Sequence, residues 1–231
     1  MRVASIIDIS LVDVPGIPVT VIFTGGCNFD CPYCQNASLI PPESGDVVDL
    51  DNLVSSLQGF LSDGFCITGG EPTLHKDLPE FLALLKTRIG GHINLNTQGS
   101  VPSILKKSLP YLDSIWFDLK ASPTRYAEVC RTNADPWPRV QESIDCILSS
   151  STQFWPRTTY VGNLMTLDDL RDIIEYLKDI DFEGRYTIQN YVPSVGVRED
   201  ESEKLALVSE DDVRITVESS SPSFEVDLDW R

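Results

Sequence analysis

The chain has 231 residues, of which 42% are hydrophobic, and a formal net charge of −17 at pH 7. That length suits one large domain or two small ones, and the apolar content is enough for a full core. The negative charge argues against a general nucleic-acid-binding protein, because phosphate contacts require a basic face, and it does not favour an anionic membrane surface. The simplest interpretation is a well-solvated acidic surface, and the alternative is a charge-matched partner.

The sequence also bears on location. No apolar run approaches the roughly 20 residues needed to cross a bilayer. The first fifteen residues contain Asp8 and Asp13 and lack the basic and then apolar pattern of a secretion signal. A chain of this size needs no disulfides to fold, so its six cysteines do not indicate a secreted framework. We therefore expect a cytoplasmic protein that does not associate with membranes.

Short β-like runs alternate with amphipathic segments along the chain, which predicts parallel β/α units. The expected strands are residues 19–23, 65–68, 92–96, 114–118, 154–161 and 186–191. The expected helices are residues 50–63, 77–89, 102–108, 138–148 and 166–177. After residue 193 the sequence indicates a polar stretch, a helix that begins at Ser209 and an alternating run over 224–230 that suits one more strand.

Two helix boundaries follow from local patterns. The first helix is expected to place Leu57 and Leu61 on one apolar face and to end at Gly64. The second is expected to begin at Asp77, because Asp77 and Glu80 have the spacing of a capping box.

Three cysteines follow directly on the first expected strand, at Cys27, Cys31 and Cys34. A [4Fe–4S] cluster takes four thiolates, one for each iron. This loop offers three, so a cluster held here keeps one iron open to a small molecule. The alternatives are a structural zinc site or three buried thiols. Zinc sites of this kind use four ligands in pairs, and neither His75 nor His92 belongs to such a pair.

The other cysteines stand alone in the sequence. Cys66 lies in an apolar strand and Cys146 on an amphipathic helix, which favours packing roles. Together with Cys130 they are too scattered to indicate a second cluster. His75 is interpreted as a surface residue, with a partner contact or proton transfer as alternatives.

Polar clusters lie just past the carboxyl ends of three expected strands, where α/β enzymes place their sites. They are Thr68–Thr73, Asn96–Gly99 and Trp116–Lys120. In the first cluster, two glycines allow the backbone to approach a ligand closely, and the Glu71 carboxylate is suited to accept hydrogen bonds from an ammonium group. Ordinary turns are the alternative explanation for all three clusters.

Five motifs in order resemble one family. The run C-x3-C-x2-C and the Gly-Gly-Glu sequence at 69–71 resemble the radical S-adenosylmethionine (SAM) enzymes. The cysteine motif continues into Q-N at 35–36, and with S-L-V-D-V-P-G at 10–16, N-T-Q-G at 96–99 and D-L-K at 118–120 the five motifs resemble the activating enzymes of glycyl radical enzymes. The resemblance covers about residues 8–193, and the joint order of the motifs is far more specific than any one of them.

The resemblance implies a fold and a cluster. The implied fold is an incomplete (β/α)6 TIM-like barrel, the radical SAM core, over residues 1–193, with residues 194–231 as a small C-terminal extension packed on the same domain. It also implies that Cys27, Cys31 and Cys34 hold a [4Fe–4S] cluster whose fourth iron is chelated by the amino and carboxylate groups of SAM.

The implied cofactor contacts come from the same motifs. Gly69, Gly70 and Glu71 are expected near the methionyl amine, and Asp118 and Lys120 beside the methionyl carboxylate or the ribose. Tyr33 is expected near the adenine, with a plain core tyrosine as the alternative. Arg157 is a further candidate for the cofactor carboxylate or for orienting the partner.

One departure from the family pattern concerns a monovalent cation. In the pyruvate formate-lyase branch, an aspartate, a threonine and a second aspartate hold that cation. Here Asn96 replaces the first aspartate, so one charge is missing and Thr97 and Asp118 are the remaining candidates. Gln98 replaces the usual asparagine, which is a milder change.

The resemblance also implies a reaction. An external flavodoxin- or ferredoxin-like reductant loads the cluster, which cleaves SAM to methionine and a 5′-deoxyadenosyl radical. That radical takes hydrogen from a backbone glycine of a partner enzyme. Anaerobic ribonucleoside-triphosphate reductase is the first choice of partner and a pyruvate formate-lyase-type enzyme the second. The alternatives are a radical SAM enzyme acting on a small molecule, similar to 7-carboxy-7-deazaguanine synthase, and an iron–sulfur electron carrier.

Overall fold

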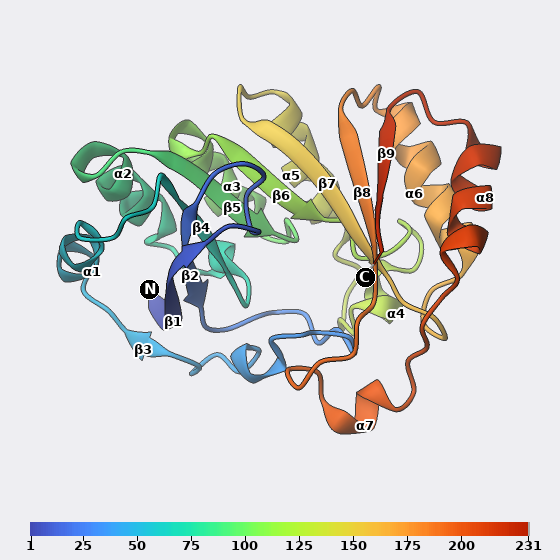
Figure 1. The fold of residues 1–231 in the computed structure, drawn as a ribbon, viewed down its shortest axis with the longest axis horizontal. Coiled ribbons are helices and arrows are strands. Elements are labelled where there is room, and N and C mark those ends of the chain that lie inside the picture. Colours follow the sequence, from blue (N-terminus) through green and yellow to red (C-terminus); the bar gives the residue numbers. More distant parts are fainter. Residues whose placement is uncertain (231) are drawn as a thin grey trace. The chain divides into compact units, whose positions relative to one another are not determined.

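The computed structural model describes residues 1–230 and divides into two compact units (Figure 1). The first unit comprises Met1–Asn28, Ser38–Trp116 and Pro138–Phe154. The second comprises residues 29–37, 117–137 and 155 onward. Cys27 therefore belongs to the first unit, whereas Cys31 and Cys34 belong to the second.

The described strands are hydrogen-bonded in the order β3-β1-β2-β4-β5-β6-β7-β8-β9. Their bounds are β1 Arg2–Ser10, β2 Val19–Thr24, β3 Asp46–Val47, β4 Gly64–Gly69, β5 His92–Thr97, β6 Ser114–Asp118, β7 Gln153–Tyr160, β8 Arg185–Asn190 and β9 Glu225–Asp229. In the first unit β2, β4 and β5 pair in parallel, and in the second β7, β8 and β9 do so. All six expected strands are present, and the α/β class with mostly parallel pairing is confirmed.

The helices alternate with these strands, as expected. They are α1 Leu50–Leu57, α2 Leu78–Arg88, α3 Pro102–Ser108, α4 Tyr126–Val129, α5 Trp137–Leu148, α6 Leu167–Asp179, α7 Glu199–Ser202 and α8 Glu210–Ser220. Short 3-10 helices occupy η1 Ala37–Leu39, η2 Pro72–Leu74 and η3 Leu109–Tyr111. Among residues 1–230, none of these helices combines the length and the apolar character that spanning a bilayer requires.

In the first unit, buried apolar strands and one apolar face of each helix form the core. β2 is buried along most of its length, which is typical of a strand covered on both faces. The Asp49 side chain accepts a hydrogen bond from the Asn52 amide at 2.9 Å and so caps α1, which buries Leu53, Val54 and Leu57.

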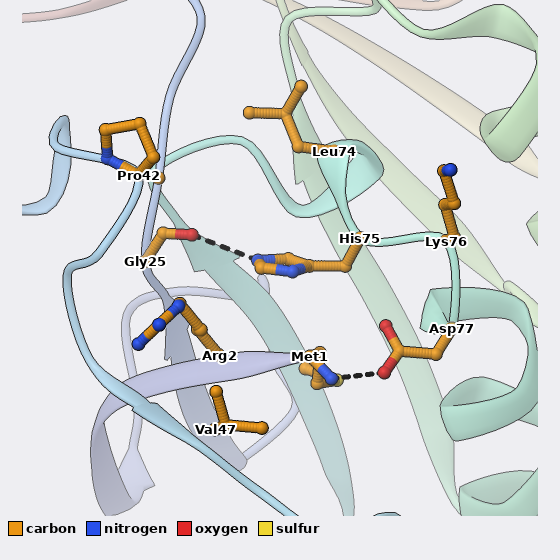
Figure 2. Close-up of a pocket in the computed structure, with 10 residues that line it drawn as sticks. Met1, Arg2, Gly25, Pro42, Val47, Leu74, His75, Lys76 and Asp77 are labelled. Atoms are coloured by element: carbon orange, nitrogen blue, oxygen red, sulfur yellow. Dashed lines mark hydrogen bonds and ion pairs between the residues drawn. The ribbon is translucent and has the colours of Figure 1, made fainter.

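One expected helix boundary in this unit is wrong, and one expected cap is absent, although α2 begins directly after Asp77 as predicted. α1 ends at Leu57, and Gly64 instead begins β4; Leu61 is 94% exposed. Asp77 makes no side-chain capping bond to α2, because its carboxylate pairs with the amino group of Met1 (Figure 2).

In the second unit, α6 and α8 pack against each other beside β8 and β9 (Figure 1). Thr166 and Asp169 form a capping box at the start of α6, with reciprocal hydrogen bonds. The tail also matches the expectation: Ser209 precedes α8, and β9 adds to β8 in parallel through residues 225–229.

β1 is the main element that the sequence analysis did not predict. It is antiparallel to β2, and its exposed residues include Ile7 and Ile9. The strand therefore lacks the continuous apolar run by which the buried parallel strands were identified.

Candidate cluster and cofactor site

The cysteine run begins where β2 ends. In the first unit, the Gly26 and Cys27 amides donate to the carbonyls of Leu39 and Ile40 at 2.8 and 3.0 Å. The Gly26 carbonyl in turn accepts a hydrogen bond from the Glu71 amide at 2.8 Å. The backbone that carries Cys27 is therefore held on two sides by other loops of the same unit.

The glycines at 69 and 70 follow β4 and make this close packing possible. Gly69 adopts φ +115°, and a Cβ there would overlap the Thr24 backbone. A Cβ on Gly70 would overlap the Gly26 carbonyl oxygen. The two glycines were expected to let a ligand approach the backbone; in the structure they also let the cysteine loop pack against it.

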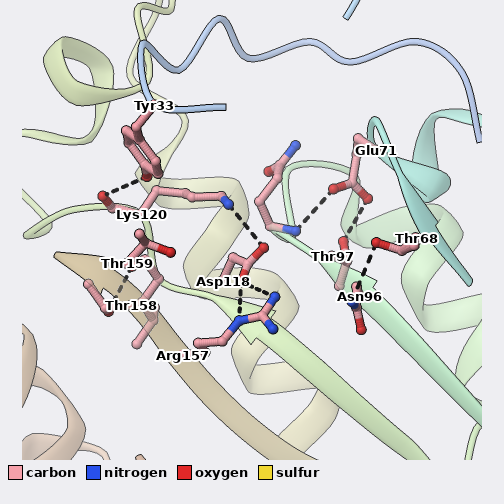
Figure 3. Close-up of polar contacts among 12 residues, drawn as sticks. Tyr33, Thr68, Glu71, Asn96, Thr97, Asp118, Lys120, Arg157, Thr158 and Thr159 are labelled. Atoms are coloured by element: carbon pink, nitrogen blue, oxygen red, sulfur yellow. Dashed lines mark hydrogen bonds and ion pairs between the residues drawn. The ribbon is translucent and has the colours of Figure 1, made fainter. Parts of the chain in front are cut away.

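Glu71 is buried, with 1% of its surface exposed, and its carboxylate is already hydrogen-bonded (Figure 3). One oxygen accepts from the Thr73 amide and hydroxyl and from the Thr97 hydroxyl, at 3.0, 2.5 and 2.6 Å. The other accepts from the Gln98 amide at 3.0 Å. Burial raises the pKa of Glu71, and these hydrogen bonds oppose the rise. The carboxylate thus ties the loop after β4 to the loop after β5 in this structure.

The residues after β5 form a further polar network. The Gln98 side-chain amide donates to the Asn28 side chain at 3.0 Å and to the Ser100 hydroxyl at 2.8 Å. The Thr97 hydroxyl accepts from the Gly99 amide at 3.1 Å in addition to donating to Glu71. The residue that departs from the family pattern at position 98 therefore holds the residue next to Cys27.

His75 is half-buried and borders a pocket, so it is less exposed than a free surface residue. A ring nitrogen lies 3.0 Å from the Gly25 carbonyl oxygen, and Figure 2 shows the ring pointing toward that carbonyl. Burial lowers the pKa of His75. The ring borders a pocket of about 530 Å³ in the first unit, which also contacts Met1 and Lys76.

In the second unit, two cations converge on Asp118 (Figure 3). Arg157 donates from Nε and Nη2 to one carboxylate oxygen at 2.9 and 2.8 Å. Lys120 donates from Nζ to the other oxygen at 2.9 Å. All three side chains are between 20% and 22% exposed. The structure thus brings together Asp118, Lys120 and Arg157.

The charges of Asp118, Lys120 and Arg157 stabilise one another. Burial disfavours the ionised Asp118, but Arg157 and Lys120 overcome it and lower the pKa of that carboxyl. Burial likewise disfavours the charged Lys120, but Asp118 outweighs it and raises the pKa of the amine. The group therefore holds two positive charges and one negative charge at neutral pH.

The second unit also contains Cys31, Tyr33 and Cys34. Tyr33 is 5% exposed; its hydroxyl lies 3.5 Å from the Lys120 carbonyl oxygen, and its ring centre lies 6.0 Å from Lys120 Nζ. Burial raises the pKa of Tyr33 well above its ordinary value. Burial also raises the pKa of Cys34.

Cys31 differs from Cys34. A hydrogen bond from the Cys130 thiol lowers the pKa of Cys31, burial opposes this, and the Lys120 charge assists it. A thiolate is the form that binds iron, so the surroundings of Cys31 suit a cluster ligand.

Within residues 1–230, no three cysteine, histidine or acidic side chains are gathered around one metal-ion position. A cubane cluster distributes its ligands, with one cysteine on each iron. The assignment of the three cysteines therefore rests on their spacing in the sequence.

The C-terminal part of the second unit covers the loop that carries Cys31 and Cys34. Arg198 donates to the Asp30 carboxylate at 2.5 Å, and the Ala37 amide donates to the Gly196 carbonyl at 3.2 Å. A Cβ on Gly196 would overlap the Gln35 carbonyl oxygen. No local motif indicates these contacts, because they join residues more than 150 positions apart.

Comparisons with known proteins agree with these motifs. The sequence profile of the radical SAM superfamily matches residues 21–177. A protein of Methanocaldococcus jannaschii named "putative glycyl-radical enzyme activating enzyme" is 28% identical over 217 residues, which are 92% of this chain and 88% of that protein. The 7-carboxy-7-deazaguanine synthase of Aquifex aeolicus is 34% identical over 86 residues, 37% of this chain and 38% of that enzyme.

A solved structure shows the same fold. Streptococcus suis SuiB bound to S-adenosylmethionine superposes with a TM-score of 0.61 at 15% identity, over 88% of this chain and 48% of SuiB. At that identity, the likeness concerns the fold alone.

Proposed function

Because this chain belongs to the radical SAM superfamily, we propose that it is an activating enzyme that generates a glycyl radical on a partner enzyme. The observation that carries the proposal is the similarity to the Methanocaldococcus jannaschii protein, which spans nearly the whole of both chains. The similarity to the deazaguanine synthase covers little more than a third of either chain.

The cofactors in this proposal are a [4Fe–4S] cluster on Cys27, Cys31 and Cys34, and SAM. When bound, the reduced cluster supplies the electron that cleaves SAM. The buried Cys31, with its lowered pKa, suits the cluster, since iron binds the thiolate.

Each unit contributes candidate cofactor residues. In the second unit, Asp118, Lys120 and Arg157 carry a net positive charge within a strongly acidic chain, which supports binding of the methionyl carboxylate. Tyr33 remains the candidate for the adenine. In the first unit, the backbone at Gly69 and Gly70 remains the candidate for the methionyl amine.

The proposed roles of Glu71 and Thr97 differ from the cofactor and cation contacts expected from the sequence. The Glu71 carboxylate and the Thr97 hydroxyl are bonded to each other, so we propose that both act by positioning the loops after β4 and β5. A monovalent cation at Thr97 and Asp118 would need the Thr97 hydroxyl to exchange its present partners.

The partner we favour is anaerobic ribonucleoside-triphosphate reductase, with a pyruvate formate-lyase-type enzyme second, and the electron donor is an external flavodoxin- or ferredoxin-like protein. A cytoplasmic location and the division into a domain over 1–193 and an extension over 194–231 also belong to the proposal.

The test has three readouts. Anaerobic reconstitution is expected to give about four irons per chain, and Cys31→Ala to abolish the cluster. Reduction in the presence of SAM is expected to release 5′-deoxyadenosine. Electron paramagnetic resonance of candidate partners after incubation is expected to show a glycyl radical doublet on one of them. An intact cluster in Cys31→Ala, or SAM left uncleaved with every candidate, would contradict the proposal.

The second candidate function is a radical SAM reaction on a small molecule, which the partial similarity to the deazaguanine synthase favours. It predicts SAM cleavage dependent on a purine-like substrate, with no radical on any partner. An electron carrier is disfavoured, because electron transfer alone does not require Lys120 and Arg157 held on Asp118.

A further inference from the structure

The pocket of Figure 2 lies within the first unit, and the contacts proposed above for the cluster and SAM do not use it. Its volume is about 530 Å³, and the buried residues Gly25 and Gly26 form part of its wall. Gly26 is bonded directly to Cys27. The amides of Gly26 and Cys27 are both hydrogen-bonded to a neighbouring loop of the unit. One wall of the pocket is therefore the fixed backbone that carries an expected iron ligand.

Positive side chains line this pocket without carboxylate partners. Arg2 and Lys76 are both lining residues, and neither forms an ion pair with an acidic side chain among residues 1–230. Arg2 donates instead to two backbone carbonyls, at 3.2 and 2.8 Å. Asp77 also lines the pocket, but its carboxylate is paired with the amino group of Met1 (Figure 2). The lining residues therefore carry a net positive charge in a chain whose formal net charge is −17.

Exposed apolar side chains complete the lining. Val47 is 73% exposed, Leu74 is 37% exposed, and Pro42 is exposed as well. Glu43 and Asp46, which are exposed neighbours of these residues in the sequence, do not line the pocket. A small-molecule site buries most of its ligand, which a depression with such exposed walls does not do. Exposed apolar side chains beside polar ones are typical of a surface that binds another protein.

We propose that this pocket is the docking site of the external electron donor, and that the donor protein presents an acidic face to Arg2 and Lys76. The inference rests on the proposed function, because it requires a cluster on Cys27. In the transfer the donor is oxidised by one electron and the cluster is reduced by one electron. No proton or chemical group moves with it.

The charge distribution supports an acidic donor face. A protein with a large negative charge repels an acidic partner over most directions of approach. A local positive site lowers that repulsion at one place, which raises the association rate and fixes the orientation of the complex. The unpaired charges of Arg2 and Lys76 meet this requirement, since no acidic side chain among residues 1–230 neutralises them.

The wall of the pocket also supplies a short covalent path to the cluster. Electron transfer through protein becomes slower with distance, so a donor is best placed against the backbone beside an iron ligand. Gly26 offers that backbone without a side chain, and its φ of +88° is one that other residues rarely adopt. The His75 ring supports the same wall, with a ring nitrogen 3.0 Å from the Gly25 carbonyl oxygen.

The test measures donor binding and cluster reduction in the full-length chain after anaerobic reconstitution. The probes are a flavodoxin and a ferredoxin, each of known negative charge. Isothermal titration calorimetry gives the dissociation constant of the complex with each probe. Stopped-flow absorbance gives the rate at which each reduced probe reduces the cluster. Reduced methyl viologen, a small cation that needs no docking site, is the reference reductant.

Two pocket variants and one control are compared. Lys76→Glu reverses a charge of the pocket, and we expect donor affinity and donor-driven reduction each to fall about tenfold. Arg2→Gln removes a charge but keeps an N–H donor for the backbone carbonyls, so a smaller fall is expected. Reduction by methyl viologen is expected not to slow in either variant. Lys107→Glu reverses an exposed charge of α3 outside the pocket and is expected to leave donor binding and reduction unchanged.

The outcomes separate this inference from the activating function. Unchanged donor binding in both pocket variants, or an equal loss in Lys107→Glu, would overturn the inference. Equal slowing with methyl viologen would mean that the variants disturb the cluster itself, and would also overturn it. A wild type that binds neither probe, yet forms a glycyl radical on a partner with a chemical reductant, would overturn it and leave the activating function standing. Donor binding that depends on Lys76, without a radical on any partner, would contradict the activating function alone.

Discussion

Arg157 donates two hydrogen bonds to a single oxygen of the Asp118 carboxylate, from Nε at 2.9 Å and Nη2 at 2.8 Å. The other carboxylate oxygen accepts a hydrogen bond from Lys120 Nζ at 2.9 Å. Asp118 thereby positions both cations: Lys120, two residues further along the chain, and Arg157, which lies in β7. The three side chains form a positively charged site that is held together by their own hydrogen bonds.

Replacement of Asp118 by asparagine tests this arrangement. Asp118→Asn leaves Lys120 and Arg157 close together and largely buried without their counter-ion. We expect the free energy of unfolding to fall by on the order of 3 kcal/mol, because removal of one member of a buried ion pair leaves uncompensated charge. The midpoint of urea unfolding, measured anaerobically, gives this value.

The matched control is Glu225→Gln, which removes a carboxylate from an exposed pair with Arg185 in the same unit. Both members of that pair are more than half exposed, so a loss below about 1 kcal/mol is expected. If the free energy of unfolding falls equally in the two variants, the ion pairs of Asp118 contribute no more than an exposed surface pair.

Gly70→Ala tests the packing beneath Cys27. The added Cβ overlaps the Gly26 carbonyl, which is backbone, so one of the two loops must move. We expect fewer irons per chain after reconstitution, because the displaced loop carries Cys27. Gly59→Ala is the control, since its added Cβ meets no atom within 4 Å. Full iron content in Gly70→Ala would show that the cysteine loop tolerates the displacement.

Glu201 gives a pH dependence with a defined sign. Two hydrogen bonds from Arg131 lower the pKa of Glu201 from 4.5 to about 2. Below pH 4.5 the unfolded chain takes up the proton first, so the stabilisation from the ionised Glu201 is present above that pH and is lost as the pH falls toward 2. Urea unfolding midpoints between pH 5 and pH 3 are therefore expected to fall more steeply in the wild type than in Glu201→Gln. Parallel slopes would contradict this assignment.

The sequence predicted the parallel strands because each is a short apolar run bounded by turn residues, as in the buried β2 and β4. It missed β1, which is partly exposed and pairs antiparallel to β2. The end of α1 was placed too late because Leu61 continues the helical apolar spacing, although the chain has already left the helix and exposes that side chain.

The site was predictable where it lies in local motifs. The cysteine spacing, the Gly-Gly-Glu run and the Asp118–Lys120 pair are all visible within a few residues of sequence. Their partners were not predictable: Glu71 is bonded to residues after the next strand, and the Asp30 amide, next to Cys31, is bonded to the Cys130 carbonyl at the end of α4. Such contacts join residues that are far apart in the chain, so no local sequence motif indicates them.

The most direct test of the central claim follows the hydrogen atom. The candidate reductase is prepared with deuterated glycine and incubated anaerobically with this protein, SAM and reductant, and the 5′-deoxyadenosine is analysed by mass spectrometry. An activating enzyme takes the atom from a glycine Cα, so we predict one deuterium in the 5′-deoxyadenosine. Unlabelled 5′-deoxyadenosine, formed at the same rate with or without the partner, would contradict the account.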